Sequence, residues 1–228
     1  MKVIDINNLT KIYNGSELMV KAVDNISLSF EQGEFAAIVG PSGSGKTTLL
    51  NMIGGLDKPT EGEILVGGTN IGGLSASKLI DFRLRNIGFV FQAYNLIPVL
   101  TAKENVEFIM ELQGKSRLER DERSIALLSA VGLGERVNAR PAKLSGGQQQ
   151  RVAVARALAS KPKFVLADEP TANLDSKSTE TLLDIMEELN KKENITFIFS
   201  THDQRVVNKA RRIITVEDGR VVSDVKRN

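Results

Sequence analysis

The chain has 228 residues and a formal net charge of +2 at pH 7, from 30 Lys and Arg and 28 Asp and Glu. This length is enough to bury the core of one domain, and the balanced charge gives no broad attraction for nucleic acid, so no nucleic acid partner is expected. The absence of cysteine excludes a disulfide framework and a cysteine-ligated metal site, and no stretch approaches the roughly 18 uninterrupted apolar residues of a membrane-spanning helix.

The N-terminal part of the chain contains short runs of strand-forming residues. Their apolar spacing predicts strands near Val3–Leu9 and Ile26–Phe30. A third run, Glu34–Val39, is almost entirely apolar, which is typical of a buried parallel strand. We therefore expect an N-terminal β-rich part that leads into an α/β core, with turn-rich crossings at 67–68 and 72–73.

A phosphate-binding pattern follows the third strand. Gly40–Thr47, called the phosphate loop below, fits G-x-x-x-x-G-K-S/T at every fixed position, and residues 47–53 then favour a helix. Such a loop directs backbone N–H groups and a helix N-terminus at an anion. A glycine-rich turn with an incidental lysine is the alternative, and the flanking strand and helix argue against it.

This loop predicts binding of ATP and Mg²⁺. Lys46 is expected to neutralise the β- and γ-phosphates, and the Thr47 hydroxyl to ligate Mg²⁺. The candidate nucleotide-binding residues of this segment are Gly40, Ser42, Gly43, Ser44, Gly45, Lys46, Thr47 and Thr48.

Residues from about 93 to 160 favour helices. Apolar residues follow helical spacing over 104–112 and again over 124–131. We expect a single domain over 1–228, with a core of about 1–92 and 161–228 and an inserted helical lobe of about 93–160. The segment Gln92–Leu100 is unusually apolar for a loop, and Pro98 argues against a helix interior. Its apolar residues either contact a partner or fill the lobe.

A second segment suited to a phosphate lies at Leu144–Gln148, called the signature segment below. Ser145 suits a helix N-cap, while Gly146 and Gly147 permit close backbone approach to a phosphate. A plain capped helix start is the alternative. One chain is not expected to wrap both this segment and the phosphate loop around a single nucleotide, so the pair indicates two chains closing around ATP.

The apolar run Phe164–Ala167 ends in two adjacent carboxylates. Neighbouring side chains of a strand point to opposite faces, so the two acids should have different roles. Asp168 suits the Mg²⁺ shell. Glu169 is positioned to accept a proton from water attacking the γ-phosphate, and general-base help of this kind is worth roughly 10²–10⁴ in rate.

His202 is the one histidine of the chain and closely follows the β-rich run 195–200. In open α/β sheets, ligands bind at the carboxyl ends of the strands. Strands ending near Val39, Gln92, Asp168 and Ser200 are therefore expected to place four side chains along one rim of the sheet. These side chains are Lys46, Gln92, Glu169 and His202.

These motifs and their order resemble the ATP-binding cassette (ABC) ATPases, and the resemblance covers essentially the whole chain. It implies that Tyr13 stacks on adenine, that Gln92 contacts Mg²⁺ and the attacking water, and that His202 contacts the γ-phosphate. It also implies that Ser145, Gly146, Gly147 and Gln148 bind the ATP held by a second copy of the chain. Ala172–Asp175 resembles the loop through which the two subunits touch.

The resemblance further implies a fold and a set of catalytic and metal residues. The fold is a P-loop NTPase core with a mostly parallel sheet, an N-terminal antiparallel β subdomain and an inserted α-helical lobe. The catalytic residues would be Glu169, His202 and Gln92, and the Mg²⁺ ligands Thr47, Gln92 and Asp168.

The expected function is ATP hydrolysis in an ABC transporter. An ATP-sandwich homodimer would drive separate integral membrane subunits, as a peripheral protein at the cytoplasmic face of the inner membrane. Three runs resemble the lipoprotein-releasing and macrolide-export subclass: Gly54–Glu63, Asn95–Val106 and Asn173–Lys177. They favour lipoprotein release or a related export task.

Other functions are alternatives to this expectation. Peptide or macrolide efflux is the near alternative, and a non-transport ABC ATPase that acts as an assembly scaffold is the more distant one. A chromosome-maintenance ATPase of this superfamily would carry a long coiled coil, and no sustained heptads lie between Lys46 and Ser145. A small-molecule kinase would have no use for the signature segment.

Overall fold

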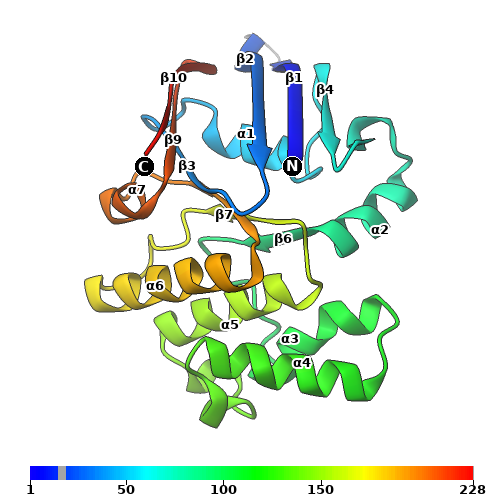
Figure 1. Cartoon of the computed structure of the whole chain (residues 1–228), viewed down its shortest axis with the longest axis vertical. Helices are drawn as coiled ribbons and strands as arrows, with labels where there is room; N and C mark the ends of the chain where they lie inside the picture. The colour runs from blue at the N-terminus through cyan, green and yellow to red at the C-terminus, as the bar shows by residue number, and fades with distance from the viewer. Residues whose placement is uncertain (15–18, 228) are drawn as a thin grey trace.

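The computed structural model describes residues 1–14 and 19–227, which form two sheets and seven helices (Figure 1). The strands are β1 (Lys2–Asn14), β2 (Met19–Glu31), β3 (Phe35–Val39), β4 (Glu61–Val66), β5 (Thr69–Asn70), β6 (Ile87–Val90), β7 (Phe164–Asp168), β8 (Thr196–Ser200), β9 (Arg212–Glu217) and β10 (Arg220–Lys226). The helices are α1 (Lys46–Ile53), α2 (Ala76–Asn86), α3 (Ala102–Leu112), α4 (Arg117–Ala130), α5 (Gly146–Ala159), α6 (Ser176–Glu193) and α7 (Gln204–Lys209). Short 3-10 turns are η1 (Ile71–Gly73), η2 (Gly134–Arg136) and η3 (Pro141–Lys143).

The predicted N-terminal antiparallel sheet is confirmed, in the order β2-β1-β4-β5. It extends further along the chain than the sequence indicated, because residues 61–70 contribute two more strands. Gly67 and Gly68, where a turn was expected, connect these strands, and both have positive φ angles, 53° and 82°. Glycine tolerates this conformation at no steric cost, which suits a two-residue hairpin turn.

The central sheet is mostly parallel, as predicted, with the order β10-β9-β3-β8-β7-β6. Among the described strands of this central sheet, only β10 runs antiparallel to its neighbour. Ser200 pairs with Ile38 on one side and with Asp168 on the other. The carboxyl ends of β3, β8 and β7 are therefore aligned at one edge of the sheet.

Side chains that alternate along the central strands build a core on each face of this sheet. Phe35 and Ala37 of β3 face the core that α3, α4, α5 and α6 cover. Ala36 and Ile38 face the second core, which includes α1 and the antiparallel sheet. Because both faces are covered, β3 has buried side chains at Phe35–Ile38, as its apolar run predicted.

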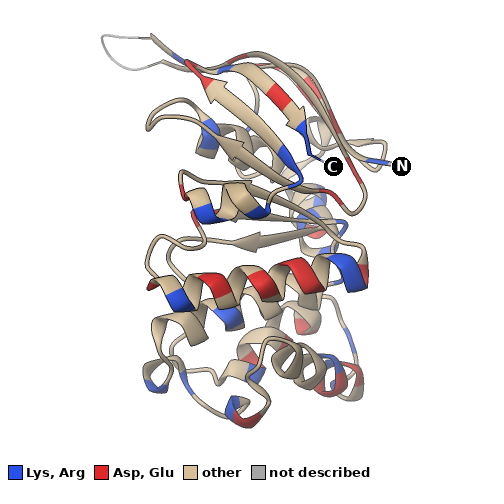
Figure 2. Ribbon diagram, turned by 60° about the vertical axis from the view of Figure 1, so that its left-hand side comes forward, with Lys and Arg blue, Asp and Glu red and all other residues tan. Residues whose placement is uncertain are grey.

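Helices α3, α4 and α5 pack on one another and lie at the end of the molecule opposite the antiparallel sheet (Figure 1). Each of these helices begins with a capping box. The hydroxyl of the N-cap residue accepts a hydrogen bond from the backbone N–H of a Glu or Gln three residues later, and the side chain of that Glu or Gln accepts one from the N-cap N–H. The capping box of α4 begins at Ser116, so this helix starts earlier than the apolar spacing of 124–131 indicated. Acidic and basic residues are interspersed over the elements (Figure 2). Among the described helices, none combines the length and apolar character needed to cross a membrane.

Candidate functional site

The phosphate loop runs from the end of β3 to the second residue of α1 and depends on glycine for its path. Gly40, Gly43 and Gly45 have φ angles of 149°, 80° and 100°. A Cβ atom on Gly40 would lie 2.0 Å from the carbonyl oxygen of Val216, and one on Gly45 would lie 2.1 Å from that of Ala22. The loop is therefore wedged between backbone segments that leave no room for a side chain at these two positions.

A cavity of about 810 Å³ opens over this loop and the start of α1. It is lined by Val20, Lys21, Ala22, Gly40, Pro41, Ser42, Gly43, Gly45, Lys46, Thr47, Thr48, Glu169, His202, Asp218 and Gly219. The loop, the residue that follows β7 and the histidine that follows β8 thus meet at one edge of the central sheet. Of the four side chains expected along this rim, Gln92 is the one that does not line the cavity.

The polar groups of the loop suit an anion. The Lys46 ammonium is nearly buried and donates hydrogen bonds to the carbonyl oxygens of Gly40 and Pro41, at 2.9 and 2.8 Å. The Ser44 hydroxyl lies buried beneath the loop, with no hydrogen-bond partner among the described residues. Together with the N-terminus of α1, this cation and the loop N–H groups form the donor set that phosphates require.

The residues expected to hold Mg²⁺ are in part brought together. The Thr47 hydroxyl donates to Oδ1 of Asp168 at 3.2 Å, so a hydroxyl oxygen and a carboxylate oxygen meet at the end of β7. Magnesium sites of this kind use one or two carboxylates and substrate phosphates, so this pair fits the cation. The Gln92 side chain is exposed, and its backbone carbonyl accepts a hydrogen bond of 3.2 Å from the Asn173 amide.

Glu169 is held in a strained backbone conformation, with a φ of 44°. Its N–H donates to the carbonyl of Ser200 at 2.8 Å. Oε1 lies 2.7 Å from Nδ1 of His202, and Oε2 accepts a hydrogen bond of 3.0 Å from the Thr201 hydroxyl. A carboxylate oxygen without a proton can only accept, so Nδ1 is the donor in this contact, and Nε2 is left for another partner. The His202 side chain is 77% exposed and that of Glu169 only 19%.

Asp203, for which the sequence motifs indicated no role, extends this network of hydrogen bonds. Its carboxylate accepts hydrogen bonds from the Thr171 hydroxyl at 2.8 Å and from the Arg205 guanidinium at 2.9 and 2.8 Å. The Arg205 guanidinium, against the opposing effect of burial, lowers the pKa of Asp203 to about 2. Several side-chain hydrogen bonds therefore connect the segment 169–171 to the segment 201–203.

Tyr13 lies outside the residues that line the cavity. The residue is 44% exposed, and its hydroxyl donates to Asp57 at 2.6 Å. The Lys11 ammonium binds the other oxygen of Asp57 at 2.6 Å and sits 4.8 Å from the centre of the Tyr13 ring. Burial and then the Asp57 carboxylate raise the pKa of Tyr13. Although burial opposes it, the hydrogen bonds from Lys11 and Tyr13 hold the pKa of Asp57 below its usual value. The ring orientation is thus fixed by an ion pair beneath it.

The signature segment occupies a different part of the molecule from the phosphate loop. Ser145 is the N-cap of α5, as predicted, and exchanges hydrogen bonds with Gln148 in the capping box. Ser145, Gly147 and Gln148 line a separate hollow of about 170 Å³ together with the start of α6. A Cβ atom on Gly147 would lie 2.9 Å from the Ser178 side chain, so glycine lets the two helix N-termini approach.

The structure adds residues to the cavity that the motifs did not indicate. The start of β2, Val20–Ala22, and the β9–β10 turn, Asp218–Gly219, both line the cavity beside the phosphate loop. The Gly219 N–H donates to the Ser44 carbonyl at 3.0 Å, and the Gly219 carbonyl accepts from the Asp24 N–H at 2.8 Å. The Asp-Gly pair is a turn signal in the sequence, but its place beside the loop follows only from the pairing of β9 with β3.

Comparisons with known proteins bear on the whole chain. The ABC transporter family model matches residues 23–172. The chain is 47% identical over 97% of its length to a protein named macrolide export ATP-binding/permease protein MacB, from Hyphomonas neptunium, of which it covers 34%. It thus spans about a third of that relative. It is also 46% identical to an uncharacterised ABC transporter ATP-binding protein of Thermotoga maritima, over 96% of this chain and 94% of that one.

Solved structures share the fold and most of the length. A dimeric structure of the ATP-binding cassette MJ0796, described as a post-hydrolysis state bound to ADP and Pi, matches with a TM-score of 0.90 and 44% identity, over 99% of both chains. An uncharacterised ABC transporter ATP-binding protein of that name occurs in Methanocaldococcus jannaschii. A second dimeric structure of MJ0796 matches equally well.

Proposed function

The chain belongs to the ABC transporter family, as an ATP-binding ATPase, and from this premise we propose that it closes as a homodimer around ATP and drives separate membrane subunits. The observation that carries the proposal is the single cavity that joins the phosphate loop to Glu169 and His202. The family's dimeric neighbour, described with ADP and Pi, supports it.

Within one chain, the phosphate loop would bind the triphosphate. Lys46 would leave the loop carbonyls and pair with the β- and γ-phosphates, and Tyr13 would present its exposed ring to adenine. Thr47 and Asp168 would hold Mg²⁺, with Gln92 joining them. The bound cation would neutralise charge on the phosphate oxygens.

Glu169 would receive the proton of the attacking water, because its carboxylate reaches the cavity and is already oriented by two partners. His202 would donate from Nε2 to the γ-phosphate while the Nδ1–H stays on Glu169, an arrangement that requires a proton on each ring nitrogen. Both groups then act on the same phosphate from the carboxyl edge of the sheet.

A second copy of the chain would complete each site. The signature segment lies in a hollow of its own and carries a capped helix N-terminus suited to an anion. We propose that it binds the γ-phosphate of ATP held by the partner copy, and that Ala172–Asp175 lies between the two copies. Loss of the γ-phosphate after hydrolysis would release the contact.

Mixing two inactive variants tests this arrangement. Lys46→Ala removes the phosphate cation, and Ser145→Arg blocks the signature segment. A mixed dimer has one site in which both parts are intact, so a mixture should recover up to roughly a quarter of the wild-type ATPase rate, while each variant alone stays inactive. Two results together would exclude a shared site: the mixture is as inactive as each variant alone, and the wild-type monomer hydrolyses ATP at the normal rate.

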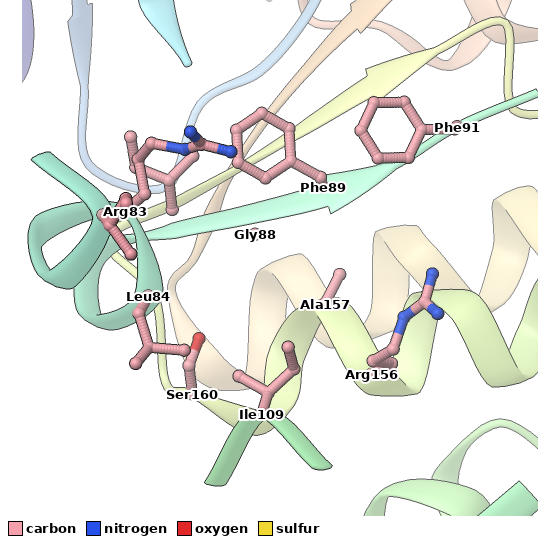
Figure 3. Close-up of a pocket in the computed structure, with 11 residues that line it drawn as sticks. Arg83, Leu84, Gly88, Phe89, Phe91, Ile109, Arg156, Ala157 and Ser160 are labelled. Atoms are coloured by element: carbon pink, nitrogen blue, oxygen red, sulfur yellow. The ribbon is translucent and has the colours of Figure 1, made fainter. Parts of the chain in front are cut away.

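We further propose that helices α3, α4 and α5 act as one lobe, over about 93–160, that moves against a core of about 1–92 and 161–228. A cavity of about 350 Å³ lies between the two parts, lined by Ile80, Arg83, Leu84, Ile87, Gly88, Phe89, Phe91, Ile109, Arg156, Ala157 and Ser160 (Figure 3). The Phe89 and Phe91 rings stack in its wall, 5.7 Å apart. This apolar surface suits a short helix of a membrane subunit.

The chemistry of that helix follows from two arginines. Arg83 lies beside Phe89, and Arg156 extends from α5 at the other end of the cavity (Figure 3). Neither forms an ion pair among the described residues, and burial lowers the pKa of both. Arg156 also donates to the carbonyls of Tyr94 and Asn95, in the apolar loop 92–100. Two unpaired cations in an apolar cavity favour a helix that carries a carboxylate.

A matched pair of variants on α2 tests the docking surface. Arg83→Glu should abolish co-purification with the membrane subunits and leave ATP binding intact. Arg85→Glu is the control, because Arg85 lies on the same helix but is exposed and pairs only with Asp81 at the surface. Equal co-purification of both variants would place the partner elsewhere. On this proposal the protein is peripheral, at the cytoplasmic face of the inner membrane.

For the transported molecule, we propose lipoprotein release or a related export task. The runs at 54–63, 95–106 and 173–177 and the relative named for macrolide export support an export subclass. Macrolide or peptide efflux is the second candidate. Identification of the membrane proteins that co-purify with the chain tests the choice, and recovery of none would favour an assembly scaffold.

A further inference from the structure

One buried hydroxyl beside the cavity has a geometry that the proposed roles do not use. Thr201 directly follows β8 and is fully buried. Its Oγ1 accepts a hydrogen bond of 2.9 Å from the N–H of Asp203 and donates one of 3.0 Å to Oε2 of Glu169. A hydroxyl has a single proton. Because the Asp203 N–H occupies the acceptor side of Oγ1, this proton is directed at Glu169.

The position of Asp203 is itself fixed. Its carboxylate is bound by Arg205 and by the Thr171 hydroxyl, and Thr171 is as buried as Thr201. The backbone N–H that orients Thr201 therefore has little freedom to move. The chain of contacts runs from Arg205 through Asp203 and Thr201 to the carboxylate of Glu169.

We propose that Thr201 is a positioning residue for ATP hydrolysis, which holds one oxygen of Glu169 so that the other faces the attacking water. The inference rests on the proposed role of Glu169 as the proton acceptor. With Oε2 held by Thr201, Oε1 is the oxygen shared with the exposed His202 ring and is the one open to the cavity. Thr201 touches neither nucleotide nor water in this scheme.

The chain offers a matched control on the same strand. Thr196 begins β8, at the opposite end from Thr201, and is also fully buried. Its hydroxyl likewise accepts one backbone N–H, that of Gly33 at 3.0 Å, and donates to one oxygen, the Glu31 carbonyl at 2.9 Å. Thr196→Val thus removes the same kind of hydroxyl at a place far from the cavity.

The first experiment measures kcat and KM for ATP in four proteins: wild type, Thr201→Val, Thr201→Ser and Thr196→Val. Thr201→Val should lower kcat by roughly 10- to 100-fold, because a small displacement of a catalytic group reduces the rate by about this factor. The KM for ATP should change by less than about twofold. Thr201→Ser keeps the hydroxyl and should restore most of kcat. Thr196→Val should keep the wild-type kcat. A Thr201→Val enzyme with wild-type kcat, or a Thr201→Ser enzyme as slow as Thr201→Val, would overturn the proposal.

The second experiment repeats Thr201→Val in a Glu169→Gln background. If Thr201 acts through Glu169, the double variant should be no slower than Glu169→Gln alone. If Thr201→Val lowers kcat in the Glu169→Gln background as much as it does in the wild type, Thr201 does not act through Glu169. Circular dichroism and thermal unfolding verify the fold, and Thr201→Ala replaces Thr201→Val in both experiments if the valine variant unfolds. Wild-type turnover by Glu169→Gln itself is a separate result, which would remove the proposed role of Glu169 and with it this one.

Discussion

Nδ1 of His202 lies 2.7 Å from Oε1 of Glu169, although one side chain is largely exposed and the other largely buried. The contact is possible because β7 and β8 are parallel neighbours, with Asp168 paired to Ser200. Glu169 then turns into a left-handed conformation, which brings its carboxylate toward the segment that follows β8. A residue in this conformation at a strand end is a frequent mark of a functional site.

Glu169→Gln is expected to bind ATP and accumulate as a closed dimer, with turnover slower by roughly 10²–10⁴. The amide has nearly the shape of the carboxylate but cannot take the proton of water. Light scattering in saturating ATP measures the dimer, and phosphate release measures turnover. Glu188→Gln, at an exposed position of α6, is the control and should behave as wild type. A Glu169→Gln protein that stays monomeric would contradict this prediction.

Asp203 is expected to make stability depend on pH in the acid range. Its pKa in the folded state is about 2, below the ordinary value of 3.8, mainly because of the Arg205 guanidinium. A lowered pKa means that the stabilisation is complete above about pH 4 and is lost as pH falls toward 2. Over that pH range, the free energy of unfolding of the wild type should fall by about 1–2 kcal/mol more than that of Asp203→Asn. The difference is limited to this size because Arg205 is partly exposed and solvent screens its charge. Urea unfolding from about pH 5 to about pH 2.5 measures the difference, and parallel curves would show that Asp203 contributes nothing to it.

Two glycines of the phosphate loop should respond differently to alanine. Both Gly43 and Gly45 have positive φ, but a Cβ on Gly43 would meet no atom within 4 Å, whereas one on Gly45 would meet the Ala22 carbonyl at 2.1 Å. Gly43→Ala should cost about 1–2 kcal/mol from the left-handed backbone alone. Gly45→Ala should cost more, because backbone must move as well. Denaturant unfolding without nucleotide measures the free energy of unfolding of both variants. Equal losses would mean that the backbone of β2 at Ala22 moves away from the added methyl group without an energetic cost.

The elements best predicted from the sequence are those whose signals are local. The buried strand Phe35–Val39 was evident from its uninterrupted apolar run, and the start of α5 from the N-cap Ser145. The phosphate loop was evident from its spacing of glycines and lysine. Each signal depends on residues that are neighbours in the chain, so it can be interpreted without the fold.

The features that were missed depend on long-range packing. Residues 61–70 became strands of the antiparallel sheet because β4 pairs with β1, which no local pattern announces. Gly219 reaches the phosphate loop only because β9 lies beside β3. The hydrogen bonds of Asp203 and Thr201 to the Thr171 and Glu169 side chains likewise require that β7 and β8 be adjacent.

Gln150 is expected to contribute to stability near the site through two hydrogen bonds that its amide donates. It lies on α5, is fully buried, and its amide donates to the carbonyls of Phe91 at 3.2 Å and Pro170 at 2.7 Å. Phe91 directly precedes Gln92, and Pro170 directly follows Glu169, so one side chain ties the helix of the signature segment to both. Gln150→Leu keeps the volume but leaves two carbonyls unpaired, each at a cost of about 1–3 kcal/mol.

The Gln150→Leu protein should therefore unfold at a lower urea concentration, by about 2–4 kcal/mol in free energy of unfolding at an unchanged m-value. It should also have a lower kcat, because the two segments that we propose to flank the reacting phosphate each lose a hydrogen bond. Gln149→Leu is the control, since Gln149 is only partly buried and donates to the Leu144 carbonyl alone, at 3.1 Å. It should lose less than about 1 kcal/mol. If the two variants are equally stable and equally active, the hydrogen bonds from Gln150 to these segments contribute nothing to stability or turnover. The lobe movement that we propose would then have to affect Gln92 and Glu169 through other contacts.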